Sequence, residues 1–300
     1  MNNSIALEQA LLKEGVYIKT GPYVSCLKSP ITSLAGSLLS LYHESQISLT
    51  EEFVDFHVSI EYPGILRHYF RPQILFKFDG FSPFKPLPAA QVYPFFEWGL
   101  NWCIATNSNS HLILHAAVVE KNDFAIVFPA APGSGKSTLC AGLVARGWRL
   151  LSDEMAMIDL KSQELTAIVR PISLKNESIK VIKKFAPDFQ FGSIVHDTNK
   201  GTVSHVKVPS AQNDMDKSAS PAWIVFPKYE KKAATSLKET SKAQAFLRAA
   251  ENSFNYNVLA ETGFNALGDV VEACECYDFC YSDLDEAIKT FDELAAEKKN

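Results

Sequence analysis

The chain has 300 residues, of which 47% are hydrophobic, 21% charged and 11% aromatic. These values are typical of a globular protein, and the length predicts one large domain or two small ones. The formal net charge is −5, which argues against nucleic-acid binding because such proteins usually carry a basic surface. No stretch of the sequence reaches the roughly 20 apolar residues of a membrane helix. We therefore expect neither a nucleic acid nor a membrane as partner.

The start of the sequence and its cysteines predict a cytoplasmic location. Residues 1–8 lack the basic start and apolar stretch of a secretion signal. The six cysteines form no CxxC pair, and a chain of this length can bury a core without disulfides. Cys274, Cys276 and Cys280 could be read as a metal site, but their spacing differs from a zinc knuckle and no histidine lies near. Buried or surface thiols are therefore favoured.

The first part of the sequence predicts a small module that contains helix and strand. Residues 1–20 have helical periodicity, and 22–80 contains short β-rich runs in which apolar and polar residues alternate. Three prolines in 80–88 exclude a helix or a central strand there. We interpret that segment as a linker, and we divide the chain into an N-terminal module, 1–90, and a second domain, 91–300.

The second domain is expected to begin with a helix near 91–106 and to continue as an α/β unit. The expected strands are 112–119, 124–128, 149–151 and 155–160, and the expected helix is 136–146. Residues 186–220 are polar and lack periodicity, which predicts a mobile surface loop, whereas 222–226 and 282–297 predict a buried strand and an amphipathic helix.

Residues 130–138 have the sequence of a phosphate-binding loop. They follow the strand 124–128 and open a helix, which is the context that this loop requires. Glycines let backbone N–H groups surround an anion, while Lys136 would reach the β- and γ-phosphates and Ser137 would bind Mg²⁺. Ala130 replaces the usual first glycine, so the loop must leave its strand by another route. The alternative is a glycine-rich helix start without a ligand. The expected nucleotide-binding residues are Pro132, Gly133, Ser134, Gly135, Lys136, Ser137 and Thr138.

Two acids and a histidine are the other candidates for the site. Asp153 and Glu154 come seventeen residues after Lys136, and a strand beside the loop strand would carry them to the same edge of the sheet. Two carboxylates there could hold Mg²⁺, or one could accept a proton from a hydroxyl. His115 interrupts the apolar strand 112–119. The alternatives are an acidic surface pair and a histidine of the core.

The sequence resembles the catalytic domain of HPr kinase/phosphorylase, a P-loop fold shared with the ATP-type phosphoenolpyruvate carboxykinases. The resemblance rests on the segments 114–116, 135–137 and 149–154, and it runs from about 110 to 295. Through 170–179 and 252–255 the chain is more similar to the HprK-related kinase A group. The resemblance implies an α/β fold (α+β overall), in which a P-loop kinase domain follows a smaller β-rich N-terminal domain.

The resemblance also implies roles for the candidate residues. Asp153 matches the base that accepts the seryl proton, and His115 matches the histidine that supports it. Glu154 would bind Mg²⁺ or join a polar network, so Ser137, Asp153 and Glu154 are the expected metal ligands. Arg170 and Lys175 are expected cations for the transferred phosphoryl group, the alternative being two cations on a solvated face. Thr138 replaces a glutamate of the HPr enzymes, which favours the kinase over the phosphorylase direction.

The predicted function is that of a kinase that uses ATP and Mg²⁺ to phosphorylate a hydroxyl group, with Asp153 as base and Lys136 and Arg170 on the phosphates. The resemblance implies a serine on a protein or peptide as acceptor. A small-molecule kinase and a non-catalytic nucleotide-binding protein stay open as alternatives. The sequence lacks the Asn-Lys-x-Asp motif of GTPases and the Leu-Ser-Gly-Gly signature of transporter ATPases. The oligomeric state is open, with a homo-oligomer as one possibility, and 186–220 and the N-terminal module are candidates for acceptor recognition.

Overall fold

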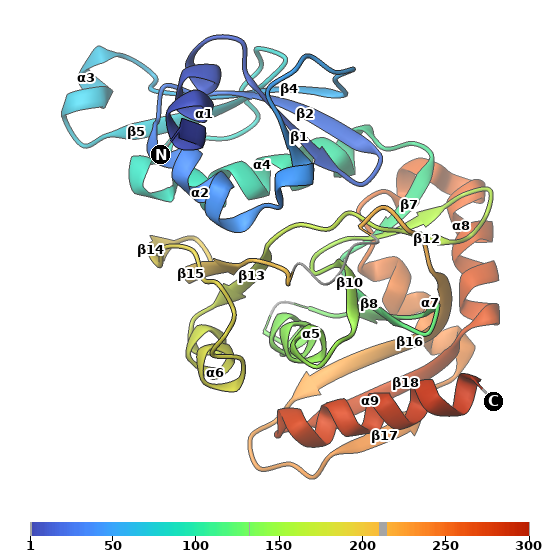
Figure 1. The fold of residues 1–300 in the computed structure, drawn as a ribbon. Helices are drawn as coiled ribbons and strands as arrows, with labels where there is room; N and C mark the ends of the chain where they lie inside the picture. Colours follow the sequence, from blue (N-terminus) through green and yellow to red (C-terminus); the bar gives the residue numbers. More distant parts are fainter. Residues whose placement is uncertain (1, 132, 210–214, 300) are drawn as a thin grey trace.

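The protein has a mixed α/β fold with several sheets (Figure 1), and the computed structural model describes residues 2–131, 133–209 and 215–299. The first hundred residues build an N-terminal sheet with the strand order β3-β1-β2-β4-β5-β6 and its helices. Within that part, α2 occupies a region that was expected to be β-rich, so this expectation was wrong there. The elements are α1 (Asn2–Leu12), β1 (Val16–Thr20), β2 (Tyr23–Lys28), α2 (Ser33–Leu41), β3 (Ile47–Ser48), β4 (Phe56–Glu61), α3 (Ile65–Tyr69), β5 (Gln73–Phe78), β6 (Leu87–Pro88) and α4 (Val92–Asn107).

The N-terminal sheet has a core that extends into the second half of the chain. Phe56, Val58 and Ile60 of β4 are buried and alternate with more exposed residues, as expected for a strand with one face in a core. The same core contains apolar residues of α2 and α4, and it also contains Ile113 and Met155. Helix α4 therefore packs with the N-terminal elements, and the core of these elements reaches the segments that carry the candidate site.

The central sheet has the strand order β10-β8-β9-β16-β18-β17. β9, β16 and β18 are parallel, while β8 is antiparallel to both β9 and β10. The carboxyl ends of β9 and β10 and the beginning of β8 consequently lie at one edge of the sheet. The elements of this part are β8 (Ala116–Lys121), β9 (Phe124–Pro129), α5 (Lys136–Ala145), β10 (Arg149–Ser152), β16 (Ser220–Tyr229), β17 (Ser236–Glu239), α7 (Lys242–Glu251), α8 (Tyr256–Ala273), β18 (Glu275–Tyr281) and α9 (Leu284–Lys299).

The apolar run that was expected to form one strand, 112–119, is divided between two sheets. β7 (His111–Leu114) pairs with β11 (Ala156–Asp159), which also pairs with β12 (Leu165–Thr166), whereas β8 belongs to the central sheet. The chain changes sheets at His115, because its backbone N–H donates to the carbonyl of Asn252 instead of continuing a ladder. β10 and β11 change between the same two sheets at residues 153–155.

The expected loop at 186–220 contains a β-hairpin, so this expectation was wrong for much of the segment. β14 (Val195–Thr198) and β15 (Gly201–Val206) pair with each other, and β15 also pairs with β13 (Ile172–Lys175), which precedes α6 (Glu177–Phe185). Ser204 and His205 are buried in β15, and these polar residues hid the strand pattern. Residues 210–214 lie outside the described part of the chain.

No helix within the described ranges is long and apolar enough to cross a membrane. The six cysteines all lie in the described ranges and are free thiols. Cys274 and Cys276 are buried and Cys280 is partly exposed.

We predict that Gly99→Ala destabilises the protein. A Cβ at Gly99 in α4 would lie 2.0 Å from the ring of Phe76, which is fully buried in β5. The clash should outweigh the gain in helix propensity and lower the free energy of unfolding by about 1–3 kcal/mol. Gly36→Ala in α2 is the matched control, since nothing lies within 4 Å of its Cβ, and it should be stabilising. Chemical denaturation of both variants tests this, and equal effects would contradict the packing of α4 on β5.

Candidate functional site

The candidate residues meet where two segments of the chain pass between sheets. Residues 130–135 follow β9, His115 precedes β8, and Asp153 and Glu154 follow β10, all at one edge of the central sheet. The acids were expected on a strand next to the loop strand, and this was wrong because β8 lies between β9 and β10. Since β10 is still parallel to β9, the acids reach the same edge from one strand further away.

A cavity of about 1230 Å³ opens at this edge. It extends between the glycine-rich loop, α6, the turn between β14 and β15, and the start of α9. Asp153 and Arg170 are not among the residues that line it, and Pro132 lies outside the described residues. The candidates that line the cavity are His115, Gly133, Ser134, Gly135, Lys136, Ser137, Thr138, Glu154 and Lys175.

The loop is held by the ends of the two parallel strands beyond it. The backbone N–H of Tyr229 donates to the carbonyl of Ser134 at 2.8 Å, and the hydroxyl of Tyr281 donates to the carbonyl of Gly135 at 2.9 Å. Gly135 has a φ of +91°, and a Cβ there would lie 2.5 Å from the Tyr281 hydroxyl. Only glycine combines that backbone conformation with this close approach.

Lys136 is a buried cation without a hydrogen-bond partner. It is the first residue of α5, it is 7% exposed, and its Nζ has no partner among the residues that the structure describes. Burial lowers its pKa to about 8, against the opposing effect of Glu154 and Asp153. The Oγ of Ser134 is also buried and lacks a partner in the described chain. Such groups are costly unless paired, and a bound phosphate at this helix N-terminus would pair both.

The two acids differ sharply in protonation. Asp153 is 5% exposed and accepts a hydrogen bond from the backbone N–H of Ser173 at 2.8 Å. Burial, and then the charge of Glu154, raise the pKa of Asp153 to about 7. Burial also acts to raise the pKa of Glu154, but Lys200, Lys175 and other cations outweigh it and lower this pKa to about 2. Near neutral pH, Glu154 is therefore the charged member of the pair, and Asp153 is the member that can gain or lose a proton.

Glu154 faces cations from several elements. Its Oε1 lies 3.4 Å from Nζ of Lys175 in β13 and 3.9 Å from Nζ of Lys200 in the turn between β14 and β15. Lys200 was not among the residues selected from the sequence. Its segment was expected to be a loop, and no motif marks it, so only the pairing of β15 with β13 brings it to the site.

His115 is half-buried and lines the cavity. Burial, and then the charge of Lys136, lower its pKa to about 4, which keeps the imidazole neutral at physiological pH. Its ring lies edge-on to that of Phe254 at 5.7 Å. Within the described chain, no hydrogen bond joins His115 to Asp153, so its expected support of that residue stays a prediction.

Arg170 is buried, with 5% exposure, and does not lie on a solvated face. Its Nη1 lies 3.4 Å from a carboxylate oxygen of Glu97, and its Nη2 donates to Asn101. Burial acts to lower its pKa, but Glu97 and other acids outweigh this effect and raise it, so the guanidinium stays charged. The structure thus places Arg170 against α4 rather than in the cavity wall.

The described residues contain no group of three or more His, Cys, Asp or Glu side chains that could hold a metal ion on their own. Ser137 and Glu154 both line the cavity beside the loop. Mg²⁺ is usually bound by one or two carboxylates together with substrate phosphates, and this pair of oxygen donors fits such a site.

Comparison with known proteins adds little to this geometry. No protein-family model matches the chain, and no curated protein matches it. Among solved structures, the chain is similar to the Hpr(Ser) kinase/phosphatase from Coxiella burnetii, with 10% sequence identity, a TM-score of 0.30, and coverage of 63% of this chain and 99% of that one. A similarity of this size carries no argument about the function of this chain.

We predict that Lys136→Met stabilises the ligand-free protein and abolishes its response to tripolyphosphate. Methionine keeps the length of the side chain but removes the unpaired buried ammonium, which should add about 1–3 kcal/mol to the free energy of unfolding. Thermal unfolding with and without tripolyphosphate measures both effects. Lys184→Met is the matched control, because Lys184 lines the same cavity but is exposed, and it should change neither. An undiminished response of Lys136→Met would contradict the phosphate site.

Proposed function

We propose that the protein is a kinase that transfers the γ-phosphate of ATP to a hydroxyl acceptor with the help of Mg²⁺. The observation that carries the proposal is the unpartnered, buried ammonium of Lys136 at the glycine-rich start of α5. It lies beside a carboxylate pair in which one member titrates near neutral pH. An anion site next to a poised base is what phosphoryl transfer to a hydroxyl requires.

The loop and the surrounding cations would bind and neutralise the triphosphate. The backbone of 133–135 and the N-terminus of α5 supply N–H groups and a partial positive charge. Lys136, Lys175 and Lys200 line the same cavity and would stabilise the negative charge of the transferred group. Because Lys175 and Lys200 are already held in place by Glu154, these two cations need little reorganisation when charge develops.

Ser137 and Glu154 would hold Mg²⁺. Asp153 is the other carboxylate that was expected from the sequence as a ligand of this ion. When bound, the ion neutralises charge on the phosphates and orients them for transfer. The low pKa of Glu154 supports this assignment, because a carboxylate must be ionised to serve as a metal ligand.

Asp153 would act as general base. The acceptor oxygen forms a bond to the γ-phosphorus, the bond from that phosphorus to the ADP oxygen breaks, and the hydroxyl proton passes to Asp153. A base with a pKa near the working pH is the most effective. Asp153 accepts from the backbone N–H of Ser173, a residue that lines the cavity and has a buried hydroxyl without a partner in the described chain. In this proposal, that hydroxyl would relay the proton from the acceptor to Asp153.

The acceptor is proposed from the resemblance to be a serine hydroxyl on a protein or peptide, with a small hydroxylated metabolite as the alternative. Incubation with ATP and Mg²⁺ and each class of acceptor separates these cases. A protein that binds nucleotide but transfers phosphate to none of them would instead be a non-catalytic nucleotide-binding protein.

We predict that Asp153→Asn lowers the rate of phosphoryl transfer by about 10²–10⁴-fold, because the base is lost. Nucleotide binding should persist, since Asp153 does not line the cavity. Single-turnover transfer and nucleotide titration measure the two effects, with the exposed Asp188→Asn as control. Wild-type turnover in Asp153→Asn would exclude this residue as the base.

We predict that kcat/KM falls about tenfold per pH unit below pH 7, because protonation of Asp153 removes the base. The charge of Glu154 is the second cause of the raised pKa of Asp153. Glu154→Gln should therefore lower this pKa and move the acidic limb of the kcat/KM profile to lower pH, even if the maximal rate falls. The pH profiles of both proteins test this, and an unchanged limb in Glu154→Gln would show that another group titrates.

A further inference from the structure

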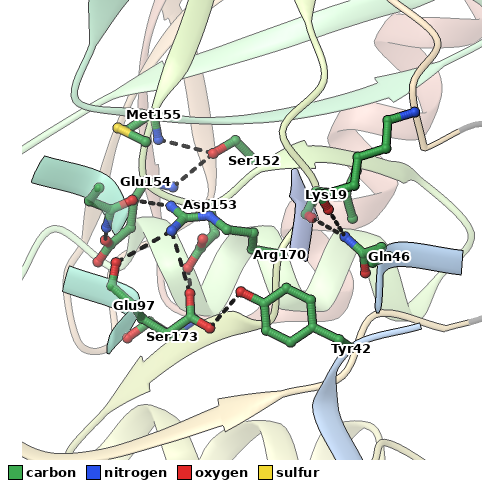
Figure 2. Close-up of polar contacts among 12 residues, drawn as sticks. Lys19, Tyr42, Gln46, Glu97, Ser152, Asp153, Glu154, Met155, Arg170 and Ser173 are labelled. Carbon is green, nitrogen blue, oxygen red and sulfur yellow. Dashed lines mark hydrogen bonds and ion pairs between the residues drawn. The ribbon is translucent and has the colours of Figure 1, made fainter. Parts of the chain in front are cut away.

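Helix α4 belongs to the N-terminal core but meets the candidate site directly. Glu97 and Asn101 lie four residues apart and therefore share one face of the helix. Both contact Arg170. The hydroxyl of Tyr42 also donates to Glu97, at 2.9 Å (Figure 2). The guanidinium thus anchors α4 to the segment that leads into β13.

Asn101 connects this anchor to the acid that lines the cavity. Its Oδ1 accepts from Nη2 of Arg170, and its Nδ2 donates to Oε2 of Glu154. An amide side chain can accept from a cation with its oxygen and donate to a carboxylate with its nitrogen at the same time. The charges on either side also fix which way the amide points. Glu154 is thereby held by Oε2, and its Oε1 is directed towards Lys175 and Lys200.

Trp98, which follows Glu97 in α4, contacts Lys200. Nζ of Lys200 lies 5.1 Å from the centre of the Trp98 ring, a distance at which a cation is attracted to an aromatic face. Gln91, just before α4, donates to the carbonyl of Asp197 in β14 at 3.0 Å. The helix therefore also supports the hairpin that delivers Lys200.

We propose that Asn101 is a positioning residue for phosphoryl transfer, which orients the carboxylate of Glu154 from helix α4, a helix that packs in the core of the N-terminal sheet. This inference rests on the proposed kinase function. None of the motifs in the sequence marks Asn101, and the residue does not line the cavity. Its effect on the reaction would pass through Glu154 alone.

The test compares Asn101→Leu, which has a similar shape but no hydrogen bonds, with Asn107→Leu, an exposed residue of the same helix. We expect kcat to fall by about 10- to 100-fold in Asn101→Leu, as for other residues that orient a metal-binding carboxylate. Nucleotide affinity without magnesium should not change, and Asn107→Leu should match the wild type. An unchanged kcat in Asn101→Leu would overturn the inference.

A double-mutant cycle shows whether Asn101 acts through Glu154. In a Glu154→Met background, Asn101→Leu should cause no further loss of kcat, and the losses in denaturation midpoint of the nucleotide-free proteins should be less than additive. Additive losses would overturn the inference, whatever the activity. If the two residues are coupled but the wild type transfers no phosphate, the proposed function fails while the contact stands.

Asn101→Asp serves as a second variant in case Asn101→Leu does not fold. It keeps the acceptor for Arg170 but places a carboxylate beside Glu154, so it removes the donor without removing the anchor. We expect a larger fall in kcat than with Asn101→Leu and an intact fold by circular dichroism. A folded Asn101→Asp with wild-type kcat would overturn the inference.

Discussion

The structure depends on a cluster of charges that are removed from water together. Lys136, Asp153, Glu154 and Arg170 are each less than 10% exposed, and each would be costly to bury alone. Glu154 is compensated by Lys175 and Lys200, and Arg170 by Glu97, but Nζ of Lys136 has no hydrogen-bond partner in the described chain. Packed apolar residues would be easier to stabilise in this position, and the incomplete cluster beside the cavity therefore supports the proposed phosphate site.

The change of sheet at two neighbouring points makes room for this cluster. Strand ladders stop at His115 and at residues 153–155, so side chains there are not confined to the faces of a sheet. The released backbone groups are satisfied locally, because the N–H groups of Glu154 and Met155 donate to Oγ of Ser152 and that of His115 donates to Asn252. Buried backbone therefore remains paired although the ladders end.

The sequence predicted the features that depend on neighbouring residues. The helix from Lys136, the strands 124–128, 149–151 and 155–160, and the final amphipathic helix agree with the structure to within a few residues, since glycine punctuation and apolar runs are local signals. The pairing partners were not predictable in this way. Nothing near Asp153 shows that β8 separates β10 from the loop strand, and the polar residues of β15 concealed the hairpin that carries Lys200.

Asn101 and Glu97 could not be selected from the sequence either, because their contacts are with residues that are distant in the chain. Both lie in a largely apolar and mostly buried helix, so an acid and an amide there look like ordinary helix residues until Arg170 and Glu154 are placed against them. The core of the N-terminal sheet includes Ile113 and Met155, which flank His115 and Glu154 in the chain. A displacement of α4 would therefore disturb the apolar packing of Ile113 and Met155, next to the two points where the chain changes sheets. It would also disturb the polar contacts of Glu97 and Asn101 with Arg170 and Glu154. The N-terminal elements are thus part of the physical support of the site.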